Sequence, residues 1–159
     1  MNKRKTIRLK DYDYSNSGLY YITICTECKQ HLFGNISNYE MTLSEAGILI
    51  LKWFNKLESK FHNVKCFDHV IMPNHIHFII EIDKESEDNV HLGQIIQWYK
   101  TMTTNDYIQN VKSNGWKRFE KRLWQRNYYE HIIRDNISCN LICDYIAHNV
   151  GNWQTDHEL

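Results

Sequence analysis

Two histidines stand one residue apart in the segment MPNHIHFII, which covers residues 72–80. Side chains along a β-strand point alternately to its two faces, so His75 and His77 share one face, roughly 6–7 Å apart at their Cα atoms. The opposite face carries Ile76 and Phe78 and is apolar, which favours packing against helices. Because neutral imidazole commonly binds divalent transition metals, the spacing predicts that both rings converge on one ion. Two polar residues on a half-exposed strand are the alternative.

Two ligands make a weak metal site, so a third ligand is expected elsewhere in the chain. Glu81 completes the pattern His-x-His-x-x-x-Glu, which belongs to the metal motif of cupins and would suit an enzyme acting on a small molecule. A cupin needs many short strands joined by glycine and proline turns. This chain has one proline, six glycines and three helical segments, so the cupin alternative is disfavoured.

The segment DYIAHN, residues 144–149, offers both a third ligand and a nucleophile. Tyr145 and Asn149 are four residues apart, so a helix places them on one face, with His148 close to that face. A tyrosine beside a metal ion can attack a phosphodiester and form a covalent phosphotyrosine, while the metal polarises the phosphate. The alternative is that Tyr145 packs in the core, as an aromatic residue on an apolar helical stripe usually does.

Positive charge is concentrated in two segments, although the formal net charge of the chain is zero. Residues 3–10 hold five basic residues and no acid, and residues 112–134 hold seven basic residues and two glutamates. Cations interleaved with tryptophans are typical of surfaces that bind single-stranded nucleic acid through phosphates and stacked bases. The residues predicted to bind DNA are Lys3, Arg4, Lys5, Arg118, Lys121, Arg122, Trp124 and Arg126. Solvated surface segments are the alternative.

A mixed set of strands and helices must position these residues. Residue patterns predict strands over 18–26, 31–37, 64–72, 75–82 and 123–134, and helices over 42–61, 92–111 and 135–149. Their order predicts an α+β, ferredoxin-like fold (β-α-β-β-α-β), in which an antiparallel sheet carries two helices on one face. The last helix is an addition that is free to pack near the open face of the sheet.

Length and composition place the chain in a broad class. Its 159 residues suit a single domain over 1–159, with residues 1–17 as a basic arm. No apolar run is long enough to cross a membrane and no apolar signal segment follows the basic start, so a cytoplasmic protein is expected. The five cysteines are odd in number and scattered, which suits reduced thiols better than a disulfide framework.

Several segments together resemble a known family. FDHVIMPNHIHFIIEI (67–82) resembles the His-hydrophobic-His (HUH) motif of single-tyrosine transposases from small bacterial insertion sequences. The segments 4–26, LGQIIQWYKTMTTNDY (92–107), LWQRNYYEHIIRD (123–135) and YIAHN (145–149) are similar to the REP-associated tyrosine transposase branch. They follow the family's order over nearly the full length of the chain.

The resemblance implies a role for each candidate residue. His75, His77 and Asn149 would bind a divalent metal ion, Mg²⁺ or Mn²⁺, and Tyr145, on a catalytic helix over 135–149, would be the nucleophile. The substrate would be single-stranded DNA near a hairpin, nicked and rejoined through a 5′-phosphotyrosine intermediate without a nucleotide cofactor. The protein would then associate with the nucleoid, and a homodimer is compatible with the family. A non-catalytic module that binds hairpin nucleic acid is the alternative.

One position departs from the family's pattern. The family commonly has proline after the asparagine at the end of the tyrosine helix, whereas Val150 follows Asn149 here. Proline would stop the helix. With valine in its place, Gly151 is expected to end the helix as a C-terminal cap.

Overall fold

The segment that carries His75 and His77 forms one strand of a four-stranded antiparallel sheet. The structure is a computed structural model that describes residues 17–88 and 90–153. Its elements are β1 (Ser17–Cys25), the 3₁₀ turn η1 (Glu27–Lys29), β2 (Gly34–Ser37), β3 (Glu40–Leu43), α1 (Glu45–Phe54), α2 (Leu57–Lys60), β4 (Val64–Met72), β5 (His75–Asp83), α3 (Leu92–Asn114), β6 (Tyr129–Ile132) and α4 (Asn136–His148). The predicted DNA-binding residues Lys3, Arg4 and Lys5 lie outside the described residues.

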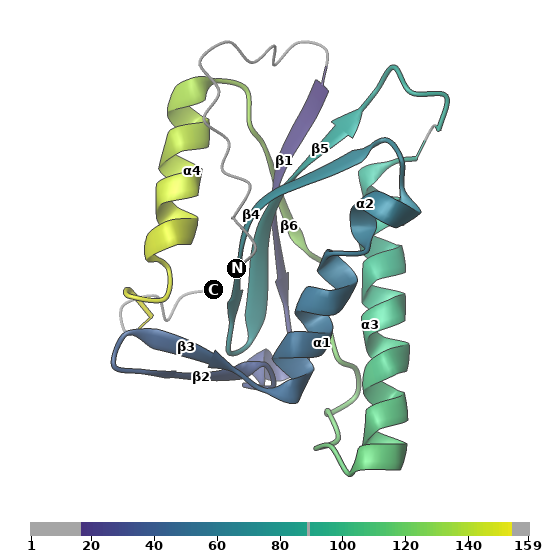
Figure 1. Ribbon diagram of the computed structural model, residues 1–159, viewed down its shortest axis with the longest axis vertical. Helices are drawn as coiled ribbons and strands as arrows, with labels where there is room; N and C mark the ends of the chain where they lie inside the picture. Colours follow the sequence, from purple (N-terminus) through teal and green to yellow (C-terminus); the bar gives the residue numbers. More distant parts are fainter. Residues whose placement is uncertain (1–16, 89, 154–159) are drawn as a thin grey trace.

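The sheet has the strand order β4-β5-β1-β6, and every neighbouring pair is antiparallel. Helices α1 and α2 lie between β1 and β4 in the chain, and α3 lies between β5 and β6, which is the connectivity of a ferredoxin-like fold. Figure 1 shows α1 and α3 on one side of the sheet and α4 on the other, with the β2–β3 hairpin at one end. The predicted fold class is therefore confirmed.

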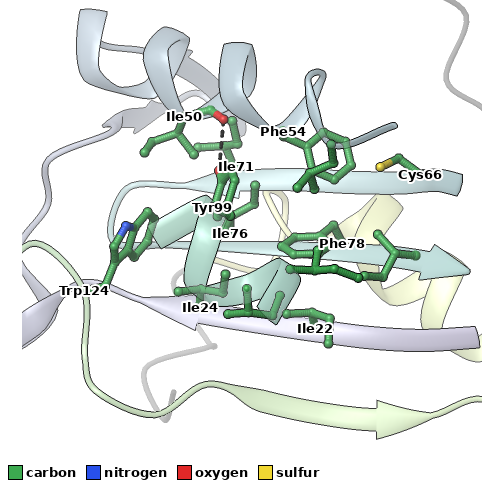
Figure 2. Packing of buried hydrophobic residues seen from close by; sticks show 14 of the residues in the cluster. Ile22, Ile24, Ile50, Phe54, Cys66, Ile71, Ile76, Phe78, Tyr99 and Trp124 are labelled. Carbon is green, nitrogen blue, oxygen red and sulfur yellow. Dashed lines mark hydrogen bonds between the residues drawn. The ribbon is translucent and has the colours of Figure 1, made fainter. Parts of the chain in front are cut away.

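One face of the sheet forms the larger core with α1 and α3. Alternation along β5 directs Ile76 and Phe78 to this face, where both are fully buried (Figure 2). The hydroxyl of Tyr99 on α3 donates a hydrogen bond of 2.9 Å to the carbonyl of Ile50 on α1, which satisfies a buried polar group and joins the two helices.

The opposite face of the sheet is covered by α4. A smaller cluster joins Leu19, Val70 and Ile79 from three strands to Cys139 and Ile146 on α4. Helix α4 therefore packs on the open face of the sheet, as the sequence predicted. This packing is what brings the helix onto the face of β5 that carries the two histidines.

The β2–β3 hairpin corrects two predictions. The predicted strand over 31–37 is shortened to β2, and the first residues of the predicted helix over 42–61 belong to β3 instead. Gly34 has a φ of 146°, and a Cβ atom there would overlap the carbonyl oxygen of Thr42 on β3. Only glycine therefore allows the two strands to approach each other at this point.

The predicted helix over 42–61 is also divided. Helix α1 begins after Ser44, whose Oγ accepts a hydrogen bond of 3.1 Å from the N–H of Gly47 and so caps the helix. At its other end the Lys56 N–H donates to the carbonyl of Trp53, three residues back, which tightens the turn. The chain then resumes as α2 with Leu57 fully buried, so packing of this side chain accompanies the break.

The predicted strand over 123–134 is reduced to β6. Upstream of β6, Trp124 forms an isolated bridge with Thr26. The carbonyl groups of the two residues after Trp124 accept hydrogen bonds of 2.8 and 3.1 Å from the Lys100 ammonium. The half-buried Lys100 side chain thus satisfies these two carbonyl groups, while the Gln125 N–H donates a hydrogen bond of 2.9 Å to the carbonyl of Cys25 at the end of β1.

Candidate active site

His75 and His77 lie side by side under α4. In the sheet, His75 pairs with Cys25 and His77 pairs with Thr23 on β1. Both rings are buried, with 3% of His75 and none of His77 exposed. Their Nε2 atoms are 3.0 Å apart. The strand alternation that predicted a shared face therefore also brings one nitrogen of each ring to the same point.

Hydrogen bonds to the other ring nitrogens orient both imidazoles. The Nδ1 of His75 lies 2.6 Å from the side-chain oxygen of Asn74, which only accepts, so this nitrogen carries the proton. The Nδ1 of His77 lies 2.7 Å from the Thr23 hydroxyl and 2.8 Å from the Tyr21 hydroxyl. Partners of this kind fix the ring orientation of metal-binding histidines. Here they hold the two Nε2 atoms facing each other.

The electrostatic environment keeps His77 neutral. Burial lowers the pKa of His77 well below its usual range, and the neighbouring His75 lowers it further. A charged imidazolium would lose its hydration inside the protein and gain no carboxylate partner in return. The neutral form is the one that binds metal ions.

Helix α4 brings Tyr145 to the histidines. Asp135 caps the helix, because its Oδ1 accepts a hydrogen bond of 2.7 Å from the Ser138 N–H. Two turns further on, the ring of Tyr145 meets the ring of His77 edge to face, with centroids 5.5 Å apart. Tyr145 remains 37% exposed, so it is not the core residue of the alternative interpretation.

The residues at and after the C-terminal end of α4 lie against His75. Asn149 is the C-cap in a right-handed helical conformation and is 1% exposed. The ring of Trp153, four residues later, stacks on the ring of His75 at a centroid distance of 6.1 Å. Asn149 thus lies in the chain between the residue that contacts His77 and the residue that contacts His75. The expectation that Gly151 caps the helix is wrong, since among the described glycines only two others have a positive φ.

The donor set fits a divalent cation. Two nitrogen ligands that each lie about 2.1 Å from an octahedral ion, at right angles, are about 3.0 Å apart. The Nε2 atoms of His75 and His77 have this separation. No group of three or more histidine, cysteine or acidic side chains that could hold a metal occurs in residues 17–88 and 90–153. Asn149, the C-cap of α4, is the third ligand predicted from the sequence.

Glu81 does not complete the site. Glu81 is four residues after His77 on β5 and pairs with Leu19 of β1. Four residues of a strand span about 13 Å, so Glu81 is too far from His77 to bind the same ion. The cupin alternative is therefore contradicted twice. Glu81 is not a third ligand, and the ferredoxin-like sheet differs from a cupin barrel.

The predicted DNA-binding residues divide into two groups. Arg118, Lys121 and Arg126 are exposed, and Arg122 is half-buried with its Nε 3.8 Å from a carboxylate oxygen of Glu27. These side chains are free to meet a phosphate backbone without rearrangement of the core.

Trp124 belongs to the core. It is 4% exposed, its indole N–H donates a hydrogen bond of 2.9 Å to the Thr103 hydroxyl, and its ring packs against Phe33. A ring buried in this way cannot stack on a nucleobase, so the prediction for Trp124 is corrected. The presence of tryptophans among basic residues in the sequence did not show whether a given ring is buried or exposed.

Sequence reasoning missed several residues of the site. Tyr21 and Thr23 alternate along β1, which shows that they share a face, but their place opposite His77 depends on strand register. Asn74 follows the only proline, in the tight turn between β4 and β5, and no sequence pattern points to a role for its side chain. Trp153 lies beyond the YIAHN motif, and no local pattern points to it.

Comparison with known proteins identifies the family. The family described as IS200-like transposases matches residues 18–149, which run from β1 to the C-cap of α4. The chain belongs to the IS200-like transposase family. This membership agrees with the family resemblance of the sequence and supports a transposase role.

Two proteins of Haemophilus influenzae are similar to this family member. One is an uncharacterised protein, 36% identical over 167 residues, covering 98% of this chain and 93% of that protein. The other is provisionally named a REP-associated tyrosine transposase and is 25% identical over 142 residues, covering 86% of this chain and 72% of that protein.

Two solved structures share the fold of this transposase. A REP-associated tyrosine transposase bound to a REP hairpin superposes with a TM-score of 0.63 at 18% identity, over 91% of this chain and 72% of the other. A structure provisionally assigned as a transposase of Deinococcus radiodurans superposes with a TM-score of 0.54 at 12% identity, over 87% of this chain and 94% of the other.

Among the described helices, none is long and apolar enough to span a lipid bilayer.

Proposed function

We propose that the protein is a metal-dependent transposase and endonuclease that nicks and rejoins single-stranded DNA near hairpins through a 5′-phosphotyrosine intermediate. One observation carries the proposal. The ring of Tyr145 contacts His77, whose Nε2 faces that of His75, in one chain. A tyrosine, two imidazoles and a buried amide are groups that can support this reaction, and Tyr145 and Asn149 lie in the last turn of α4 and at its C-cap.

In the proposed reaction, the Oη of Tyr145 attacks the phosphorus of a DNA phosphodiester. A bond forms between Oη and phosphorus, and the bond from phosphorus to the 3′ oxygen breaks. The phenolic proton is released to solvent and the 3′ oxygen takes up a proton, which yields a free 3′-hydroxyl. Because the phosphotyrosine ester retains the phosphodiester bond energy, a 3′-hydroxyl can reverse the reaction and rejoin the DNA without a nucleotide cofactor.

His75, His77 and Asn149 would hold the divalent ion, Mg²⁺ or Mn²⁺. When bound, the ion acts as a Lewis acid on the scissile phosphate. Asn74, Tyr21 and Thr23 hold the two rings in place through the hydrogen bonds described above. Tyr145 is 37% exposed while its ring contacts His77, so in the proposed reaction a DNA strand approaches it from solvent.

The substrate proposal rests on the exposed cations and on the family. Arg118, Lys121 and Arg126 present positive charge that can neutralise phosphates, and Arg122 can join them. The hairpin is proposed because the similar solved structure is described as bound to a REP hairpin. Attraction of this kind falls as the salt concentration rises.

The experiment that tests the function detects a covalent protein–DNA adduct. The protein is incubated with labelled DNA hairpins carrying single-stranded flanks, in Mn²⁺, in Mg²⁺ or in EDTA, and separated on a denaturing protein gel. We expect an adduct that survives denaturation in either metal and is absent in EDTA. Hairpin binding that EDTA leaves unchanged, with no adduct in either metal, would favour the non-catalytic binding module instead.

Substituting valine for Thr23 should weaken metal binding. Valine has nearly the same shape as threonine but removes the hydroxyl that lies 2.7 Å from His77 Nδ1, so the ring loses one of its two orienting partners. Loss of such a partner typically costs about 10- to 100-fold in metal affinity, and we expect the lower end because Tyr21 remains. Titration calorimetry with Mn²⁺ measures the change.

The control for this substitution is Thr42→Val, which makes the same change on an exposed position of β3. It should leave the affinity for Mn²⁺ unaltered. Equal affinities of Thr23→Val and the unmodified protein would show that this hydroxyl does not orient a metal ligand.

A further inference from the structure

A cavity of about 280 Å³ lies between the tip of the β2–β3 hairpin and the segment after α4. Figure 1 shows this hairpin next to the C-terminal end of α4. The cavity is lined by Tyr39 and Trp153 together with small polar and aliphatic residues, and none of its lining residues is charged. Such a surface suits a flat, uncharged ligand with polar edges and not a phosphate group.

Tyr39 occupies a backbone conformation that is costly for a bulky residue. Asn38 and Tyr39 form the two-residue turn between β2 and β3, with φ values of 50° and 60°. Glycine is the usual residue at the second position of such a turn, because bulky side chains are strained at positive φ. Tyr39 is also 77% exposed, so its ring adds little to the core. A strained, exposed aromatic residue beside a cavity points to a binding role.

Trp153 connects the cavity to the active site. Its ring stacks on His75 and also lines the cavity. A ligand held between Tyr39 and Trp153 would therefore contact a residue that stacks on a proposed metal ligand. Asn38 and Ser37 line the same cavity. Amide and hydroxyl groups of these residue types can form hydrogen bonds with the edge of a planar ring.

We propose that this cavity binds one unpaired nucleobase of the substrate strand close to the scissile phosphate, with Tyr39 as its stacking residue. The inference rests on the proposed function, because the base must belong to the strand that enters the site. Stacking on an aromatic ring is available to every base, while the polar residues of the turn contact the base edge and would set a preference among bases.

Affinity measurements with the full chain test the proposal. The ligands are a fluorescent oligothymidine and an oligonucleotide of the same length built from abasic residues, both in EDTA so that no cleavage intervenes. We expect Tyr39→Gly to bind the oligothymidine about 5- to 100-fold more weakly than the unmodified protein, and the abasic strand equally well. Tyr39→Phe, which keeps the ring, should bind both strands like the unmodified protein.

The substitution carries its own control for folding. Glycine relieves the strain at positive φ, so the melting temperature of Tyr39→Gly should equal or exceed that of the unmodified protein. An equal loss on both strands would indicate a backbone contact and overturn the proposal, as would no loss on either strand. Because the measurement needs no cleavage, it separates failure of this subsite from failure of the proposed reaction, which the adduct assay reports.

Discussion

Replacing Tyr145 with phenylalanine should abolish the covalent DNA adduct while hairpin affinity stays within about twofold. The substitution removes one oxygen atom, the proposed nucleophile, and leaves the ring that contacts His77. Removal of a nucleophile in a well-studied protease lowers the rate by about a millionfold, so we expect a loss of at least about a thousandfold. The denaturing gel measures the adduct, and fluorescence anisotropy measures affinity for the same hairpin.

Tyr129→Phe is the matched control. Tyr129 lies on β6, is 62% exposed and belongs to the NYYEH segment, which offers competing tyrosines. The adduct should form normally in this variant. A Tyr145→Phe protein that still forms the adduct, or an adduct lost only in Tyr129→Phe, would assign the nucleophile elsewhere.

Replacing His75 with alanine should remove the stabilisation that Mn²⁺ gives to the folded protein. A ligand present at a hundred times its dissociation constant stabilises the native state by about 2.7 kcal/mol. We expect this increment to disappear in His75→Ala, together with the adduct, because only one imidazole remains. Differential scanning fluorimetry with and without Mn²⁺ gives the increment for each variant relative to its own metal-free melting temperature.

His62→Ala provides the comparison for this experiment. His62 lies in the turn between α2 and β4 and is exposed, so its loss removes an imidazole from the protein without changing a residue of the candidate site. It should retain the full increment from Mn²⁺. If His75→Ala retained it as well, the two converging nitrogens would not be the ligands of the ion.

Much of the fold was predictable because the spacing of apolar residues that is typical of a strand or a helix can be recognised within a single segment. The alternation along β5 predicted which side chains face the helices, and the order of elements predicted the ferredoxin-like plan. The failures occurred where a neighbouring element decides the local structure. Leu43 fits a helical stripe, but it pairs with Gly34 across the hairpin. The sequence around Gln125 resembles a strand, but the Lys100 ammonium binds its carbonyl group and the ladder with β1 is limited to isolated hydrogen bonds.

The candidate site was predictable to the same degree. The spacing of His75 and His77 and that of Tyr145 and Asn149 are local patterns, so each pair was visible separately. That Tyr145 meets His77 follows from α4 packing on the open face, which is a tertiary contact. The contact of Trp153 with His75 joins residues almost eighty positions apart, and no sequence period encodes it.

The two faces of the sheet are held with unequal strength. Among the described residues, 23 buried side chains form the core with α1 and α3, whereas 7 form the cluster beneath α4. Since hydrophobic free energy grows with the apolar area buried, lifting α4 costs less than separating the other helices. Local unfolding favours such weakly held layers. The histidines, buried when α4 is closed, would thus gain access to ions from solvent by an opening of this helix that leaves the larger core folded.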